Sequence, residues 1–196
     1  MTHSAVQNRL AWDDRWSQPN LDQLLHPLKV QPRRLFDQII GKVTSLSNVD
    51  RAIIWYGPSW KWTIYYTLPA STLVHLPPLG GSGTATAGSG ASANAGHPAS
   101  GKNSDPETLC YLVPNHQNPL ICVPLSDAVI DRLPLKRLNR FVREAIASSK
   151  CAVTIHWAIF APTTLAETSY LVDLIERKHA ILTGGQGPVL KPESKK

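Results

Sequence analysis

The sequence has few of the features that would place a chain in a known functional class. It contains three cysteines, and their spacing fits neither a disulfide framework nor a zinc ribbon: Cys110, Cys122 and Cys151. No apolar run approaches the ~18 residues that a membrane helix needs. The first thirty residues do not have the pattern of a signal peptide. We therefore expect a soluble, cytoplasmic protein with no membrane partner, and we predict no metal and no cofactor.

Catalytic motifs are also missing from the sequence. It has no GxSxG nucleophile elbow, no HExxH pair and no glycine-rich phosphate loop that follows a strand. The glycine-rich stretch 80–101 has neither the lysine nor the helix start that a phosphate cradle requires. Because no nucleophile is seen beside a base, we predict no catalytic residue and favour a function other than catalysis.

The composition supports one folded domain with appendages. Of the 196 residues, 42% are hydrophobic and 17% are charged, which is enough apolar material for a core. No Asp, Glu, Lys or Arg occurs from Trp62 to Gly101, and from Gly80 the stretch is mostly Gly, Ser, Ala and Thr. Such a stretch cannot bury enough apolar surface to offset its ordering entropy. We predict an N-terminal arm (1–31), one domain (32–182) with a low-complexity loop inserted between strands (76–106), and a disordered tail (183–196).

Hydrophobic periodicity predicts alternating groups of strands and helices. The expected helices cover residues 32–47, 133–149 and 165–181, and the expected strands cover 52–56, 60–68, 109–113, 120–123 and 151–160. Turn residues join the first four strands into two hairpins. This order indicates an α+β fold, a curved antiparallel sheet of about five strands with helices packed on one face.

Three segments resemble a bacterial domain-of-unknown-function family akin to the YdhG-like proteins. They are residues 57–68 (GPSWKWTIYYTL), 109–114 (LCYLVP) and 151–178. The likeness runs in order over residues 30–182 apart from the insertion, and it implies a small α+β domain with a curved antiparallel sheet. The sequence departs from that family in the insertion itself and in the uncharged turn after Val113. The family has no established activity, so the resemblance implies no site residues.

The predicted strands are rich in aromatic residues, and a curved sheet would turn those that no helix covers into a concave groove. Trp60 and Trp62 alternate in step with Ile64, so we expect both to pack in the core. The opposite face is the better place for a ligand. Our candidate ligand-binding residues are Lys61, Tyr65, Tyr111 and His156. A histidine inside a strand is also commonly a hydrogen-bonded structural residue.

A second candidate site is a cluster of basic residues on the helix predicted over 133–149 and just before it. At 100° per residue, most of them fall within one arc opposite the apolar face. The candidate anion-binding residues are Arg132, Lys136, Arg137, Arg140 and Arg143. Such a stripe can hold phosphates, but the solvated face of an ordinary amphipathic helix has the same pattern.

These observations favour a small binding module that holds a small molecule or a protein partner without catalysing a reaction. The alternative is anion or nucleic-acid binding through the basic segment from Arg132 to Lys150, which the net charge of +6 would assist.

Overall fold

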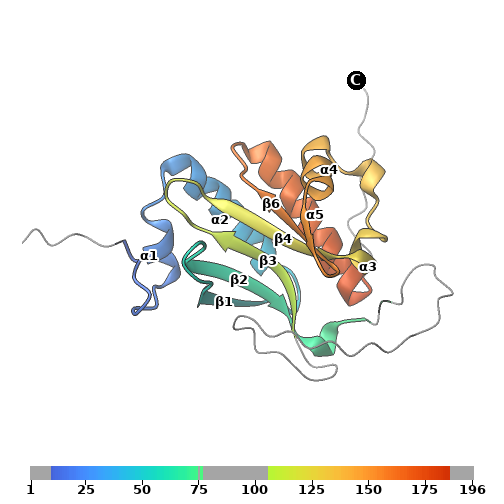
Figure 1. Cartoon of the computed structure of the whole chain (residues 1–196), viewed down its shortest axis with the longest axis horizontal. Helices are drawn as coiled ribbons and strands as arrows, with labels where there is room; N and C mark the ends of the chain where they lie inside the picture. Colours follow the sequence, from blue (N-terminus) through green and yellow to red (C-terminus); the bar gives the residue numbers. More distant parts are fainter. Residues whose placement is uncertain (1–9, 75, 77–105, 186–196) are drawn as a thin grey trace, which may run out of the picture.

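The computed structural model describes residues 10–74, 76 and 106–185. Most of the predicted insertion and the tail beyond Gly185 lie outside these residues. The described chain is an α+β fold built on one six-stranded antiparallel sheet, as the sequence predicts in outline (Figure 1). Its strands, in sheet order, are β1 (Asp50–Trp55), β2 (Trp62–Leu68), β3 (Glu107–Val113), β4 (Leu120–Ser126), β6 (Ile155–Phe160) and β5 (Lys150–Ala152).

The sheet has one strand more than predicted because residues 151–160 do not form a single strand. Val153 and Thr154 turn the chain, and Ala152 pairs with Ile155 across a tight hairpin. Val153 has a φ of 61°, in the left-handed region, and its side chain is 97% exposed. A β-branched residue rarely adopts this conformation, so the sequence carried no turn signal here.

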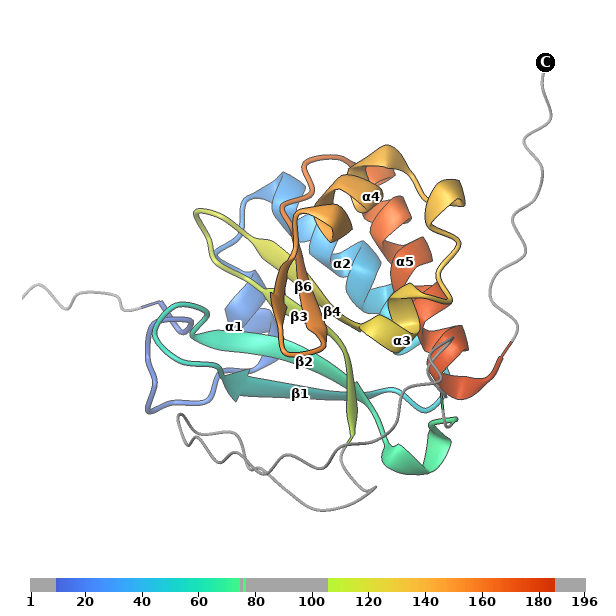
Figure 2. The same cartoon turned by 45° about the vertical axis from the view of Figure 1, so that its right-hand side comes forward.

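Helices cover one face of the sheet. The two long ones are α2 (Val30–Thr44) and α5 (Leu165–Thr183), which pack against each other behind the strands (Figure 2). The short ones are α1 (Leu21–Leu25), α3 (Asp127–Ile130) and α4 (Arg140–Ala147), with 3₁₀ turns η1 (Ala70–Thr72) and η2 (Leu135–Arg137). A capping box between Thr164 and Glu167 starts α5, and Gly184 ends it at a φ of 69°.

The helix predicted over 133–149 is wrong in its first half. Residues 135–137 form only a 3₁₀ turn, and the backbone is extended again at Leu138. The α-helix begins after Asn139, whose side chain caps it by accepting a hydrogen bond from the Phe141 amide at 2.9 Å. The apolar residues therefore keep a helical spacing across Leu138, although the backbone there is extended and a new helix starts at the Asn139 cap.

The pairing between the two central strands is incomplete, and a buried lysine lies where this pairing ends. Strands β3 and β4 share three registered pairs, which end at Tyr111 and Cys122. Beyond them, the ammonium of Lys178 on α5 donates hydrogen bonds to the carbonyl oxygens of Thr108 and Pro124, one from each strand. Lys178 is fully buried, and this burial lowers its pKa from 10.5 to about 8. A side-chain cation thus supplies a donor to one carbonyl of each strand beyond the end of their registered pairing.

The described part of the N-terminal arm packs onto the domain. Trp12, Leu24 and Leu25 are buried in the common core. The indole Nε1 of Trp62 donates to the Asp14 carbonyl at 2.6 Å. The Lys61 ammonium pairs with Asp13 and lies 4.3 Å from the Trp12 ring centroid.

Candidate functional site

The sheet face opposite α2 and α5 carries the candidate site. Registered partners in neighbouring strands share a face, and one such row crosses the middle of the sheet. It runs from Tyr65 to Tyr111, Cys122 and Ile159. Trp157 lies on the same face of β6, two residues before Ile159.

Five aromatic rings on this face form one continuous group, which we call the aromatic cluster: Tyr56, Trp60, Tyr65, Tyr111 and Trp157. Tyr111 is its centre and is only 3% exposed. Tyr65 stacks on one side of it at a centroid distance of 5.0 Å, and Trp157 stacks at 6.0 Å. Offset stacks at these distances hold their members in fixed orientations, so the cluster is a firm surface.

The prediction that both tryptophans pack in the core holds for Trp62, whereas Trp60 belongs to the aromatic cluster and is a partly buried residue packed against the core. Lys61 has a φ of 50° and its amide donates to the Gly57 carbonyl at 2.7 Å, so the chain turns between Trp60 and Trp62. The turn breaks the alternation and sends the two indoles to opposite sides. Trp62 is 7% exposed and contacts the arm, whereas Trp60 stacks on Tyr56 at 4.9 Å.

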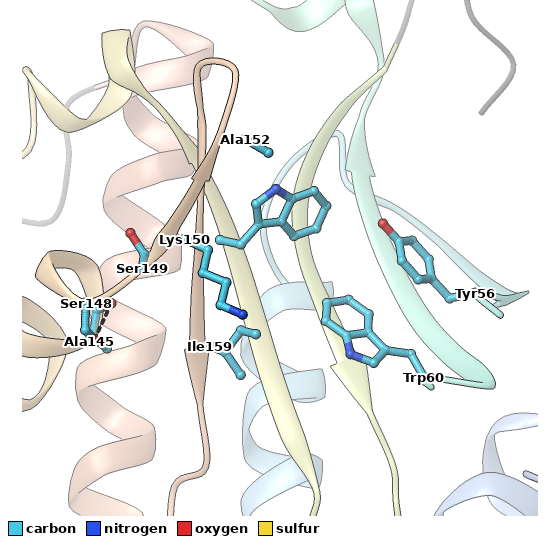
Figure 3. A pocket seen from close by; sticks show the side chains of 9 residues that line it. Tyr56, Trp60, Ala145, Ser148, Ser149, Lys150, Ala152 and Ile159 are labelled. Carbon is cyan, nitrogen blue, oxygen red and sulfur yellow. Dashed lines mark hydrogen bonds between the residues drawn. The ribbon is translucent and has the colours of Figure 1, made fainter. Parts of the chain in front are cut away.

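Beside the cluster lies a pocket of about 640 Å³, a size typical of small-molecule sites. Its lining comes from the loop after β1, the end of α4 and the β5–β6 hairpin (Figure 3). The lining residues are Tyr56, Trp60, Ala145, Ser148, Ser149, Lys150, Ala152, Trp157 and Ile159. The centroids of Trp60 and Trp157 are 6.3 Å apart, with their planes at 68°. Two indoles therefore form an angled aromatic corner.

Most polar groups of the pocket are engaged within the protein. Ser148 Oγ donates to the Glu144 carbonyl at 2.8 Å, and Ser149 Oγ donates to the Ile146 carbonyl at 2.6 Å. Burial raises the pKa of the Tyr56 hydroxyl, which is hydrogen-bonded to the Tyr111 side chain. These groups are consequently poorly placed to bind a ligand.

Lys150 is the cationic residue of the lining. It pairs with Trp157 across the β5–β6 hairpin, so both side chains emerge on the same face. Figure 3 shows its ammonium extending into the pocket toward Ile159 and Trp60. Across the described ranges 10–74, 76 and 106–185, no carboxylate lies within ion-pair distance of this ammonium.

The structure brings together two of the four predicted ligand residues, Tyr65 and Tyr111, in the aromatic cluster, but none of the four lines the pocket. Lys61 instead holds the N-terminal arm through Asp13. His156 faces the helix side, because Leu125, its partner on β4, is a fully buried core residue. The sequence reasoning did not single out Tyr56 or Lys150 for the site. Only a hairpin at Val153 would have revealed Lys150, by setting it opposite Trp157.

A serine, a histidine and an aspartate do meet on the helix side. His156 Nδ1 lies 3.3 Å from Ser149 Oγ, and its Nε2 lies 3.0 Å from Asp127 Oδ1. The Ser149 hydroxyl also donates to the Ile146 carbonyl at 2.6 Å, which is the shorter of its two contacts. The hydroxyl oxygen also points away from the pocket in Figure 3. The three residues tie the β5–β6 hairpin to α3 and α4.

The predicted basic stripe does not exist as one helical arc. Its members occupy three segments: Arg132 follows α3, Lys136 and Arg137 lie on η2, and Arg140 and Arg143 lie on α4. Arg132 donates to the Ala128 carbonyl at 2.7 Å, and Arg140 pairs with Glu144 at 2.6 Å. The basic residues do not share one face because the backbone is extended at Leu138, so residues before and after it do not belong to the same helix.

Comparison with known proteins adds no relative. No family model matches the chain, and neither a curated protein nor a solved structure matches it. The resemblance to the YdhG-like family therefore stays a prediction. None of the helices in the described residues is long and apolar enough to cross a membrane. Within the same residues, no three His, Cys, Asp or Glu side chains are grouped as a metal site would require.

Proposed function

We propose that this protein is a non-catalytic binding module that holds a small, flat, largely apolar molecule on the open face of its sheet. The observation that carries the proposal is the pocket beside the aromatic cluster. Small-molecule sites are concave, mostly apolar and largely pre-formed. Here the rings that form the wall are already locked by stacking on one another, so a ligand would not have to order them.

Trp157 is the residue on which this proposal is best tested. It joins the pocket lining to the centre of the aromatic cluster, through its contacts with Trp60 and Tyr111. Removing its ring would open the aromatic corner while leaving the core side of β6 untouched. Trp16 offers a matched control, because its indole is 86% exposed and does not line the pocket.

The experiment is a calorimetric titration with 2-naphthamide, an uncharged two-ring probe. We expect binding to the wild-type protein, a loss of about thirtyfold in affinity in Trp157→Ala, and no change in Trp16→Ala. Tyr65→Ala, which removes the stacking partner of Tyr111, should reduce the rise in melting temperature that the probe causes. Equal binding to the wild-type protein and to Trp157→Ala, or no binding to either, would overturn the proposal.

The alternative is anion or nucleic-acid binding through the basic segment. That function would make affinity for an oligonucleotide fall steeply with salt and vanish when Arg137 and Arg140 are both replaced by Glu. The aromatic pocket predicts no effect of this double change on 2-naphthamide, because neither residue lines it.

A further inference from the structure

We infer that the natural ligand of the pocket is a planar aromatic carboxylate, with its rings against Trp60 and Trp157 and its carboxylate on the ammonium of Lys150. This inference rests on the proposed function and narrows it to one chemical class. It follows from the side chains that line the pocket, which are two indoles, one tyrosine, three apolar side chains, two serines that donate to carbonyls of α4, and one cation.

The rings of the ligand are specified by the aromatic corner. Trp60 and Trp157 meet at 68°, so a flat molecule stacked on one indole presents its edge to the other. Both stacked and edge-to-face contacts are favourable aromatic geometries. An aliphatic chain would fill the same volume without using this arrangement.

The charge of the ligand is specified by Lys150. Its ammonium points into the pocket, and no side-chain carboxylate in the described chain neutralises it. Ser148 and Ser149 donate their protons to backbone carbonyls of α4, so they do not compete as donors to an anion. An anionic group would therefore find one strong donor here, and a charge-assisted hydrogen bond is about twice as strong as a neutral one.

The size of the pocket limits the ligand to a small molecule. A volume of about 640 Å³ holds a molecule of two or three fused rings with its carboxylate. The pocket lies between the loop after β1 and the edge strand β5, so the ligand's rings would lie against the two indoles and its anionic group beside the Lys150 ammonium.

The test compares 2-naphthoate with 2-naphthamide, two probes of the same shape that differ in charge. For the wild-type protein we expect 2-naphthoate to bind about tenfold more tightly, with the difference shrinking as salt is added. Lys150→Gln should bring the two affinities within about twofold of each other, mainly by weakening the binding of 2-naphthoate. Lys42→Gln removes the same charge from the exposed surface of α2, on the helix side, and should leave the preference intact.

Failures of the two proposals are distinguishable. Equal affinity of the two probes for the wild-type protein, or a preference that persists in Lys150→Gln, would overturn the carboxylate inference and leave the binding module standing. Binding of 2-naphthoate that Trp157→Ala does not weaken would overturn both, since it would show only general attraction between an anion and a basic protein.

Discussion

The ammonium of Lys178 donates a hydrogen bond to the carbonyl oxygen of Pro124, at a point where β4 no longer pairs with β3. The same ammonium also donates to Thr108 on β3. A helix side chain thus performs the task that amide groups perform elsewhere in the sheet. The arrangement extends the connection between β3 and β4 beyond their three registered pairs.

Lys178→Met should destabilise the protein strongly. The substitution keeps most of the side-chain volume but removes the ammonium that donates to two carbonyl oxygens, so we expect a loss of roughly 2–4 kcal/mol in the free energy of unfolding. Urea unfolding followed by circular dichroism measures it. Lys42→Met, at an exposed position on α2, is the control and should change little. A Lys178→Met protein as stable as the wild type would contradict the role assigned to this lysine.

The stability of the wild-type protein should rise between pH 8 and 9. Lys178 has a pKa of about 8 when folded and 10.5 ordinarily, so in this window the unfolded chain binds a proton that the folded chain has begun to release. Through Lys178 unfolding becomes more costly by about 1 kcal/mol over that unit, and the ionisation of Cys110 and Cys122 in the unfolded chain offsets about 0.7 kcal/mol of it, so that a small net rise remains. The Lys178→Met protein should lack this increment, and unfolding of both proteins at the two pH values measures it.

Above pH 9 the trend should reverse. Burial raises the pKa of Cys110 and Cys122 from 9.0 to about 12, so the folded chain keeps thiol protons that the unfolded chain loses. Stability therefore falls as the pH rises from 9 toward 12. Continued increase across this range would contradict the burial of the two thiols.

Val153→Asn should stabilise the protein by about 1 kcal/mol. Valine at a φ of 61° is strained, whereas asparagine adopts the left-handed conformation more readily. The side chain is 97% exposed, so nothing is lost from the core. The control is Val30→Asn, which changes an exposed valine in α2. Comparing the melting temperatures of the two variants separates relief of strain from a general effect of polarity. An unchanged melting temperature in Val153→Asn would refute the strain.

Gly184→Ala should destabilise the end of α5 by roughly 1–2 kcal/mol. Gly184 has a φ of 69°, and a Cβ atom there would lie 2.9 Å from Cγ1 of Val74. The neighbouring Gly185→Ala is the matched control, because its nearest contact would be 3.6 Å away and its φ is ordinary. Chemical unfolding of the two variants should differ clearly. Adding Val74→Ala to Gly184→Ala should recover the part of the loss that comes from the contact.

The sequence predicted the regular elements well where one period dominated. The strand at Trp62–Leu68 and the helix at Leu165–Thr183 both follow clear patterns and lie close to the ranges that the sequence predicts. The failures at Lys61 and Val153 share one cause. Each residue occupies the left-handed region without being glycine or asparagine, so no local composition announces the turn.

The candidate site was predicted only in part, because its geometry depends on register. Tyr65 and Tyr111 were each assigned to a strand, but a long stretch of chain separates them and no pattern specifies which residues pair. Lys150 reaches the pocket only through the unforeseen hairpin. His156 lies on the strand that the sequence predicts. The side of the sheet that it faces is set by its pairing with Leu125, and the sequence does not show this pairing.

In the sequence, the residues of one pocket wall come before 77–105 and those of the other wall come after it. Tyr56 and Trp60 precede that stretch, and every other lining residue follows it. A backbone cut within it would divide the polypeptide into two pieces, neither of which carries a complete binding surface, joined through the pairing of β2 with β3. The pocket would then form only on reassembly, so a bound ligand would strengthen the association of the pieces. The molecule thereby offers a starting point for a ligand-responsive split protein.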